Sequence, residues 1–192
     1  MTHLSVAVAM ANSVGILILA ALLYVVLAGQ GKVVAIVALG CWVGEAMFYA
    51  LGWVGAAGLI PLSRDFVSAG APDGSFHQAL GTFLYDGLNG FGGTVLMFFY
   101  CVGGVGWYAL LYRSRLVPRA IPAYGLAAVA VGLTGSVVEL LGTDVSMFAY
   151  LPILPFELAV GGWLLFKGVA AGSPTSARPT VAALGPAPTA RP

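Results

Sequence analysis

The distribution of hydrophobic and polar residues divides the chain into five long apolar segments joined by short polar connections. A membrane-spanning helix needs about 20 predominantly apolar residues, and each segment reaches that length. Within the segments, charge is limited to one carboxylate in each of the last four and a lysine near the end of the fifth. The pattern predicts an all-α, polytopic transmembrane helical bundle with five spans, at about 4–28, 33–60, 79–112, 120–142 and 147–170.

Two of these segments raise questions about where a helix ends. The second is followed by Pro61, which predicts that its helix stops there. The third would measure about 50 Å as one straight helix, which exceeds the bilayer core of about 30 Å. We therefore expect it to be tilted, to extend beyond the membrane, or to be broken in its glycine-rich beginning.

The composition changes close to the carboxyl end. From Gly172 onward the chain consists mainly of Pro, Ala, Thr, Ser and Gly, which bury too little apolar surface to offset the entropy of ordering. We predict one bundle domain over residues 1–171 and a disordered tail over residues 172–192.

Overall composition agrees with a protein whose main solvent is lipid. Of the 192 residues, 60% are hydrophobic and 8% are charged, whereas a soluble domain has roughly 25% charged residues. A net charge of +1 offers nucleic acid no electrostatic attraction, so the lipid bilayer is the expected partner. Cys41 and Cys101 both lie in apolar segments, where we expect small hydrophobic side chains rather than a disulfide.

Basic residues predict the orientation in the membrane. Arg113, Arg115 and Arg119 follow the third segment within seven residues, and cytoplasmic loops are enriched in Lys and Arg. With five spans, Lys32 and the basic residues of the tail fall on the same side. We therefore expect a multi-pass protein of the plasma membrane with its amino terminus outside and its carboxyl terminus in the cytoplasm.

Two stretches resemble a known family. The sequences LYRSRLVPR at residues 111–119 and LPILPFELAVGGWLLFKG at residues 151–168 are similar to bacterial membrane proteins of the domain of unknown function 4386 family, over roughly residues 1–170. Members typically have six spans, so the resemblance implies either a late start at Met1 or a five-span variant that lacks the first helix. The family has no established activity, so the resemblance supports fold and topology and identifies no catalytic residue.

Polar side chains within the segments are the candidates for function. With the predicted orientation, every segment places one of them in the outer half of the membrane, and small residues share their helix faces, as at closely packed helices. An ionised carboxylate at that depth costs several kcal/mol, so each acid is protonated, paired or exposed to a watery cavity. These residues are Asn12, Glu45, Asp86, Glu139 and Glu157.

We expect an outward-facing acidic pocket that binds a ligand through four residues, Glu45, Asp86, Asn89 and Glu157. The available partners for the acids are two outer-loop residues, Arg64 and His77, and three hydroxyl donors, Tyr85, Tyr100 and Tyr150. More acids than cations in this region indicates raised pKa values or a bound cation. The secondary candidates are Asn12, Glu139, His77 and Arg64.

The leading hypothesis is therefore an integral membrane protein that binds or moves a cation or small polar molecule. One alternative is a non-enzymatic structural or interaction protein, in which Glu157 starts a helix after Pro155, Glu139 sits at the interface and Asp86 caps a helix. Another is an intramembrane enzyme with a carboxylate acid/base pair.

Motifs for soluble chemistry are missing from the sequence. It contains no HExxH, no CxxC and no phosphate loop, so we expect no metal site, no cofactor and no catalytic residue, and we favour a non-enzymatic protein. Gly40 and Gly44 form a GxxxG pattern, which predicts a face for helix–helix association with a second copy.

Overall fold

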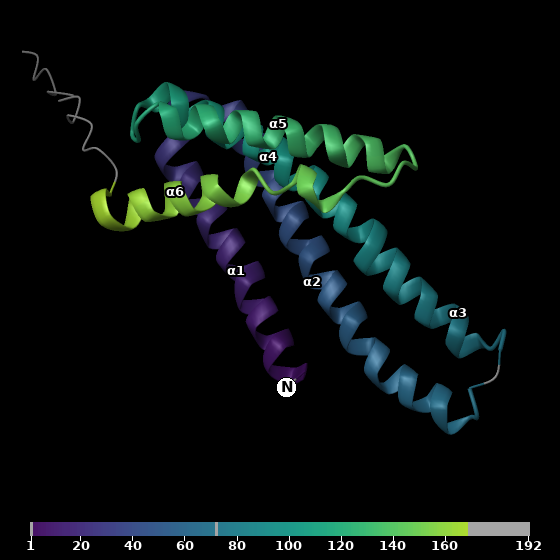
Figure 1. Ribbon diagram of the computed structural model, residues 1–192. Coiled ribbons are helices and arrows are strands. Elements are labelled where there is room, and N and C mark those ends of the chain that lie inside the picture. The colour runs from purple at the N-terminus through teal and green to yellow at the C-terminus, as the bar shows by residue number, and fades with distance from the viewer. Residues whose placement is uncertain (1, 72, 169–192) are drawn as a thin grey trace, which may run out of the picture.

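The computed structural model describes residues 2–71 and 73–168, which form an all-α bundle without strands (Figure 1). Five of its helical segments are long and apolar enough to cross a membrane, so the predicted fold class is confirmed. The predicted tail, 172–192, lies outside the described residues. The elements are α1 (Thr2–Leu27), the 3₁₀ turn η1 (Ala28–Gln30), α2 (Lys32–Ser68), α3 (Phe76–Thr82), the π-helix η2 (Phe83–Phe91), α4 (Gly92–Ser114), α5 (Ala120–Leu140), the 3₁₀ turn η3 (Met147–Ala149) and α6 (Ile153–Lys167).

The expected stop at Pro61 is wrong, because α2 continues through this proline to Ser68. A proline inside a helix removes one backbone hydrogen bond, here the one to the carbonyl of Ala57 four residues earlier, and a membrane helix tolerates that loss. The second helix is therefore eight residues longer than the predicted segment at this end.

The third span is one continuous helical run over Phe76–Ser114, comprising α3, η2 and α4. It is not broken at its glycine-rich beginning; instead, nine residues there adopt a π-helix. Figure 1 shows α2 and this run side by side, extending together away from α5 and α6 toward the turn that connects them.

The length of this hairpin means that part of it lies outside the hydrocarbon core. The 37 residues of α2 would measure about 55 Å, and even at a tilt of about 40° they would cover about 42 Å along the membrane normal. The bilayer core is only about 30 Å thick. The turn between α2 and α3 is surrounded by polar residues, namely Arg64, Asp65, Asp73 and His77. We therefore infer that this end of the hairpin extends beyond the hydrocarbon core.

Helix α4 is the centre of the bundle. It packs along α2 on one side and α5 on the other, while α1 packs mainly on α2, and α6 packs on α5. Glycines permit these close approaches: a Cβ on Gly103 would lie 2.5 Å from Cδ1 of Trp42, and one on Gly125 would lie 2.4 Å from Cε2 of Phe156. The backbone of α4 thus rests directly on an α2 side chain, and α5 rests directly on α6.

An aromatic cluster fastens α2 to α4. The Trp42 ring stacks on the Tyr100 ring with centroids 6.0 Å apart and meets the Trp107 ring edge-on at 6.1 Å. The Trp42 Nε1–H also donates to the backbone carbonyl of Tyr100 at 3.3 Å. This bond ties α2 to the backbone of α4 at Trp42, three residues before Glu45.

Large apolar side chains cover the outside of the bundle. Phe166 is 87% exposed, Leu165 84% and Val25 77%, as expected of surfaces that contact lipid. In the GxxxG pattern, Gly44 faces the Phe99 ring of α4, whereas a Cβ on Gly40 would have no atom within 4 Å. Gly44 is therefore used for packing within the chain, and only Gly40 remains open.

Candidate functional site

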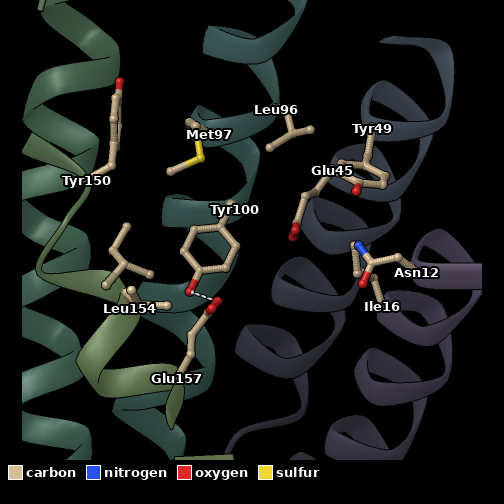
Figure 2. Close-up of a pocket in the computed structure, with 11 residues that line it drawn as sticks. Asn12, Ile16, Glu45, Tyr49, Leu96, Met97, Tyr100, Tyr150, Leu154 and Glu157 are labelled. Atoms are coloured by element: carbon tan, nitrogen blue, oxygen red, sulfur yellow. Dashed lines mark hydrogen bonds between the residues drawn. The ribbon is translucent and has the colours of Figure 1, made fainter. Parts of the chain in front are cut away.

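A pocket of about 310 Å³ lies between α1, α2, α4 and the segment that enters α6 (Figure 2). It brings together two of the four primary candidates, Glu45 and Glu157, with the secondary candidate Asn12. The rest of the pocket is lined by tyrosines and by apolar side chains. The complete lining is Asn12, Ile16, Glu45, Tyr49, Leu96, Met97, Tyr100, Tyr150, Ile153, Leu154 and Glu157.

Glu45 is the buried carboxylate of this pocket. Its side chain is 7% exposed, and its buried Oε2 has no hydrogen-bond partner among the described residues. Trp42 and Gly44 hold the surrounding turn of α2 tightly against α4. An unsatisfied buried polar group costs about 1–3 kcal/mol, and a charged one costs more. Glu45 is therefore held in place by packing, and none of the residues that the structure describes bonds to that oxygen.

Glu157 is the second carboxylate, and in contrast it has a donor. The Tyr100 hydroxyl donates to Glu157 Oε1 at 2.8 Å (Figure 2). The same hydroxyl lies 3.0 Å from the Tyr108 hydroxyl. Because the single proton of Tyr100 is directed to the carboxylate, Tyr108 must be the donor in the second bond. Two buried tyrosines thus form a chain of hydroxyls that ends on Glu157, and the predicted role of Tyr100 as a donor is confirmed.

Glu139 lies behind the pocket wall. It accepts a hydrogen bond from the Tyr150 hydroxyl at 2.9 Å, so the predicted role of Tyr150 is also confirmed. Tyr150 contributes its side chain to the pocket, whereas Glu139 does not line it. Ser136, 3.3 Å from the same hydroxyl, donates to the Gly132 carbonyl at 3.0 Å. This arrangement ties α5 to the segment before α6.

The structure does not bring Asp86 and Asn89 into the same pocket. Both are on η2, where Asp86 is exposed and Asn89 lines a separate hollow of about 170 Å³ next to Gly52. The Asn89 amide donates to the carbonyl of Leu84, five residues earlier, at 3.4 Å. The four primary candidates are therefore divided between two locations.

The register of the hairpin explains this division. Phe99 packs against Gly44, one residue before Glu45. Asp86 precedes Phe99 by thirteen residues, which corresponds to about 20 Å along a helix axis. The expected coincidence of depth between Glu45 and Asp86 is therefore contradicted.

The two predicted outer-loop cations do not neutralise the acids. Arg64 is on α2 beyond Pro61, and His77 is on α3 with its ring beside that of Phe76. Within residues 2–71 and 73–168, no carboxylate lies within 4.0 Å of a lysine or arginine nitrogen. Tyr85, the third predicted donor, is 65% exposed. Tyrosine hydroxyls, not cations, serve as partners of Glu139 and Glu157.

The family profile described as Domain of unknown function (DUF4386) matches residues 2–168. The chain belongs to this family. No curated protein and no solved structure matches the chain. Membership agrees with the resemblance of the arginine loop and the α6 segment, and the description assigns no activity.

Two lining residues of this DUF4386 protein were not among the predicted site residues, although the sequence carries a signal for each. Tyr49 follows Glu45 by four residues and so shares its helix face. Met97 precedes Tyr100 by three residues and shares its face in the same way. Among the described residues there is no group of three or more His, Cys, Asp or Glu side chains able to hold a metal ion.

Proposed function

We propose that this DUF4386 protein binds a small organic cation in the pocket between α1, α2, α4 and α6. The observation that carries the proposal is the buried Glu45 carboxylate oxygen, which has no hydrogen-bond partner among the described residues and borders a pocket that Glu157 also lines. No Lys, Arg or His contributes to this pocket among the residues that the structure describes. A cation would supply the missing partner and offset the cost of burying the charge.

The composition of the lining favours an ammonium-type ion with an apolar body. Inorganic cations such as Ca²⁺ take six to eight oxygen ligands, whereas here the carboxylates are accompanied by aliphatic and thioether side chains, including Ile16, Leu96 and Met97. Tyrosine rings attract a cation over their faces. A volume of about 310 Å³ is at the lower end of the range for small-molecule sites.

We further propose that the pocket belongs to the outer half of a plasma-membrane protein. Tyr100 precedes Arg113 by thirteen residues of α4, or about 20 Å. If the arginine-rich end faces the cytoplasm, as the distribution of basic residues favours, the amino terminus is outside. The pocket then lies nearer the outer surface.

The test is binding of benzyltrimethylammonium to the purified full chain in detergent, measured by calorimetry, with benzoate as the anion of similar size. Wild type should bind the cation and not benzoate. Glu45→Gln and Glu157→Gln should each lower the affinity about tenfold, because a charge-assisted contact is worth about 1.5–3 kcal/mol. Asp86→Asn is the matched control, since Asp86 is an exposed carboxylate of the same protein outside the pocket.

A structural role for the acids is the second candidate, and the bonds from Tyr100 to Glu157 and from Tyr150 to Glu139 favour it. It predicts that the two Gln variants change thermal stability without affecting cation binding. Equal affinity in wild type and both variants would therefore refute the proposed function. If Asp86→Asn alone lost binding, the cation would have to bind at η2 and not in the proposed pocket.

A further inference from the structure

A second pocket, unrelated to the acidic one, lies at the arginine-rich end of the bundle. It has a volume of about 330 Å³ and is formed by the connection between α4 and α5 and by one side chain of α6. Arg115 adopts a left-handed backbone conformation with φ of 57°, which turns the chain directly after α4. The lining is Arg115, Leu116, Val117, Pro118, Arg119 and Trp163.

The turn is anchored, so the two arginines are presented by a fixed backbone. Val117, between them, is 3% exposed and belongs to the buried core. Pro118 limits the backbone further, and its carbonyl accepts a hydrogen bond from the N–H of Ile121 at 3.0 Å. The Arg119 guanidinium lies 5.1 Å above the centre of the Tyr112 ring, which holds its charge beside the pocket.

In the part of the chain that the structure describes, no carboxylate pairs with these two arginines, since none lies within ion-pair distance of either. The pocket also borders the start of α5, whose first turn contains no acidic residue and no side-chain cap. Because a helix N-terminus carries partial positive charge, it adds to the attraction of the two guanidinium groups for an anion.

The other wall of the pocket is apolar and continues into a lipid-facing surface. Trp163 shares its helix face with Phe166, three residues later, which is 87% exposed. Tryptophan is enriched where membrane helices meet the headgroup layer. Lys167, four residues after Trp163, places a third basic residue at the same end of α6.

We propose that this pocket binds the phosphate headgroup of an anionic phospholipid, with Arg115 and Arg119 on the phosphate and the acyl chains along the α6 surface. Guanidinium groups match phosphate oxygens in a bidentate manner that lysine does not reproduce. A basic pocket between helices on the cytoplasmic side is a setting in which lipid headgroups bind. The Trp163 wall favours a lipid over a free phosphate ion.

The experiment measures binding of phosphatidylglycerol and phosphatidylcholine to the full chain in detergent by native mass spectrometry. Wild type should prefer phosphatidylglycerol. The double variant R115Q/R119Q should lose about 25-fold in affinity, because each glutamine replaces a charge-assisted guanidinium–phosphate contact by a weaker neutral one, for roughly a fivefold loss at each position. R113Q is the matched control: Arg113 is an exposed arginine next to the same turn that does not line the pocket.

A second variant distinguishes a specific phosphate site from non-specific attraction by positive charge. It also keeps both charged side chains, so that a loss of binding is less easily explained by misfolding. R115K/R119K keeps both charges and removes the bidentate geometry, so it should still lose about fivefold or more. The proposal is overturned if R113Q loses as much as R115Q or R119Q singly, if R115K/R119K binds like wild type, or if both lipids bind equally. Displacement of phosphatidylglycerol by excess inorganic phosphate would also overturn it, because the ligand would then be free phosphate.

Discussion

Replacing the two carboxylates of the acidic pocket by methionine should change stability in opposite directions. Methionine has nearly the length of glutamate without its charge, so Glu45→Met keeps the packing of a side chain that is 7% exposed and removes an oxygen that has no described partner. Glu157→Met instead removes the acceptor of the Tyr100 hydroxyl. Replacement by methionine thus removes an unsatisfied carboxylate oxygen at Glu45, whereas at Glu157 it leaves the Tyr100 hydroxyl without its acceptor.

The size of the difference follows from the cost of an unsatisfied buried group. Glu45→Met should raise the free energy of unfolding by about 1–3 kcal/mol, and Glu157→Met should lower it by about 1–2 kcal/mol. The second value is the smaller one because the hydroxyl of Tyr100, a buried residue, retains Tyr108 at 3.0 Å as a partner. The two variants should therefore differ by roughly 2–5 kcal/mol.

Thermal unfolding in one detergent, followed by tryptophan fluorescence without added cation, measures this difference. For a chain of this size 1 kcal/mol corresponds to about 2–4 °C, so the two melting temperatures should be separated by on the order of 10 °C. Tyr49→Phe is the control, because Tyr49 lines the pocket and has no described hydrogen bond. If Glu45→Met lowered the melting temperature as much as Glu157→Met, Glu45 would have to be a structural residue.

Two further predictions concern the packing and the hydroxyl chain, and thermal unfolding in the same detergent checks both. Gly125→Ala should destabilise the protein by about 1–3 kcal/mol, because its Cβ would lie 2.4 Å from the Phe156 ring, whereas Gly162→Ala, with no atom within 4 Å, should leave stability unchanged or slightly higher. Tyr100→Phe removes two hydrogen bonds and should cost about 2–3 kcal/mol, and Tyr108→Phe, which removes one, should cost about 1 kcal/mol. Equal losses of stability in Gly125→Ala and Gly162→Ala would contradict the close contact of Gly125 with Phe156. Equal losses in Tyr100→Phe and Tyr108→Phe would contradict the bond from Tyr100 to Glu157.

The helices of the bundle were predictable because the signal for a membrane span is local. Length and hydropathy identify five segments without reference to their neighbours, and residues 2–71 and 73–168 form five such helices. The prediction that the second helix ends at Pro61 was wrong because a local rule was applied where the helix tolerates the proline. A proline removes only one backbone hydrogen bond, and a membrane helix can lose one bond without ending, as α2 does at Pro61.

The candidate site was only partly predictable because it depends on contacts between helices. Counting residues from the ends of each segment places Glu45 and Asp86 at similar depth only if the predicted ends are correct. With α2 extended to Ser68 and α3 starting at Phe76, the hairpin is longer than expected at its polar end. The neighbours of an acid are then determined by where glycine meets a large side chain, as Gly44 meets Phe99.

The π-helix accounts for the remaining discrepancy, because it changes which residues share a face. Asp86, Asn89 and Gly93 form one stripe if the helix repeats every 3.6 residues. In η2 the backbone hydrogen bonds span five residues, as in the bond from the Gly92 N–H to the Gly87 carbonyl. The Asn89 side chain lies next to Gly52 and lines the hollow there, whereas Asp86 does not line it. Helix α4 returns to regular geometry at Gly92, and within it the Tyr108 hydroxyl reaches the Tyr100 hydroxyl, which in turn bonds to Glu157. Glu45 and Glu157 consequently line one pocket because both lie beside α4, the regular part of the third span.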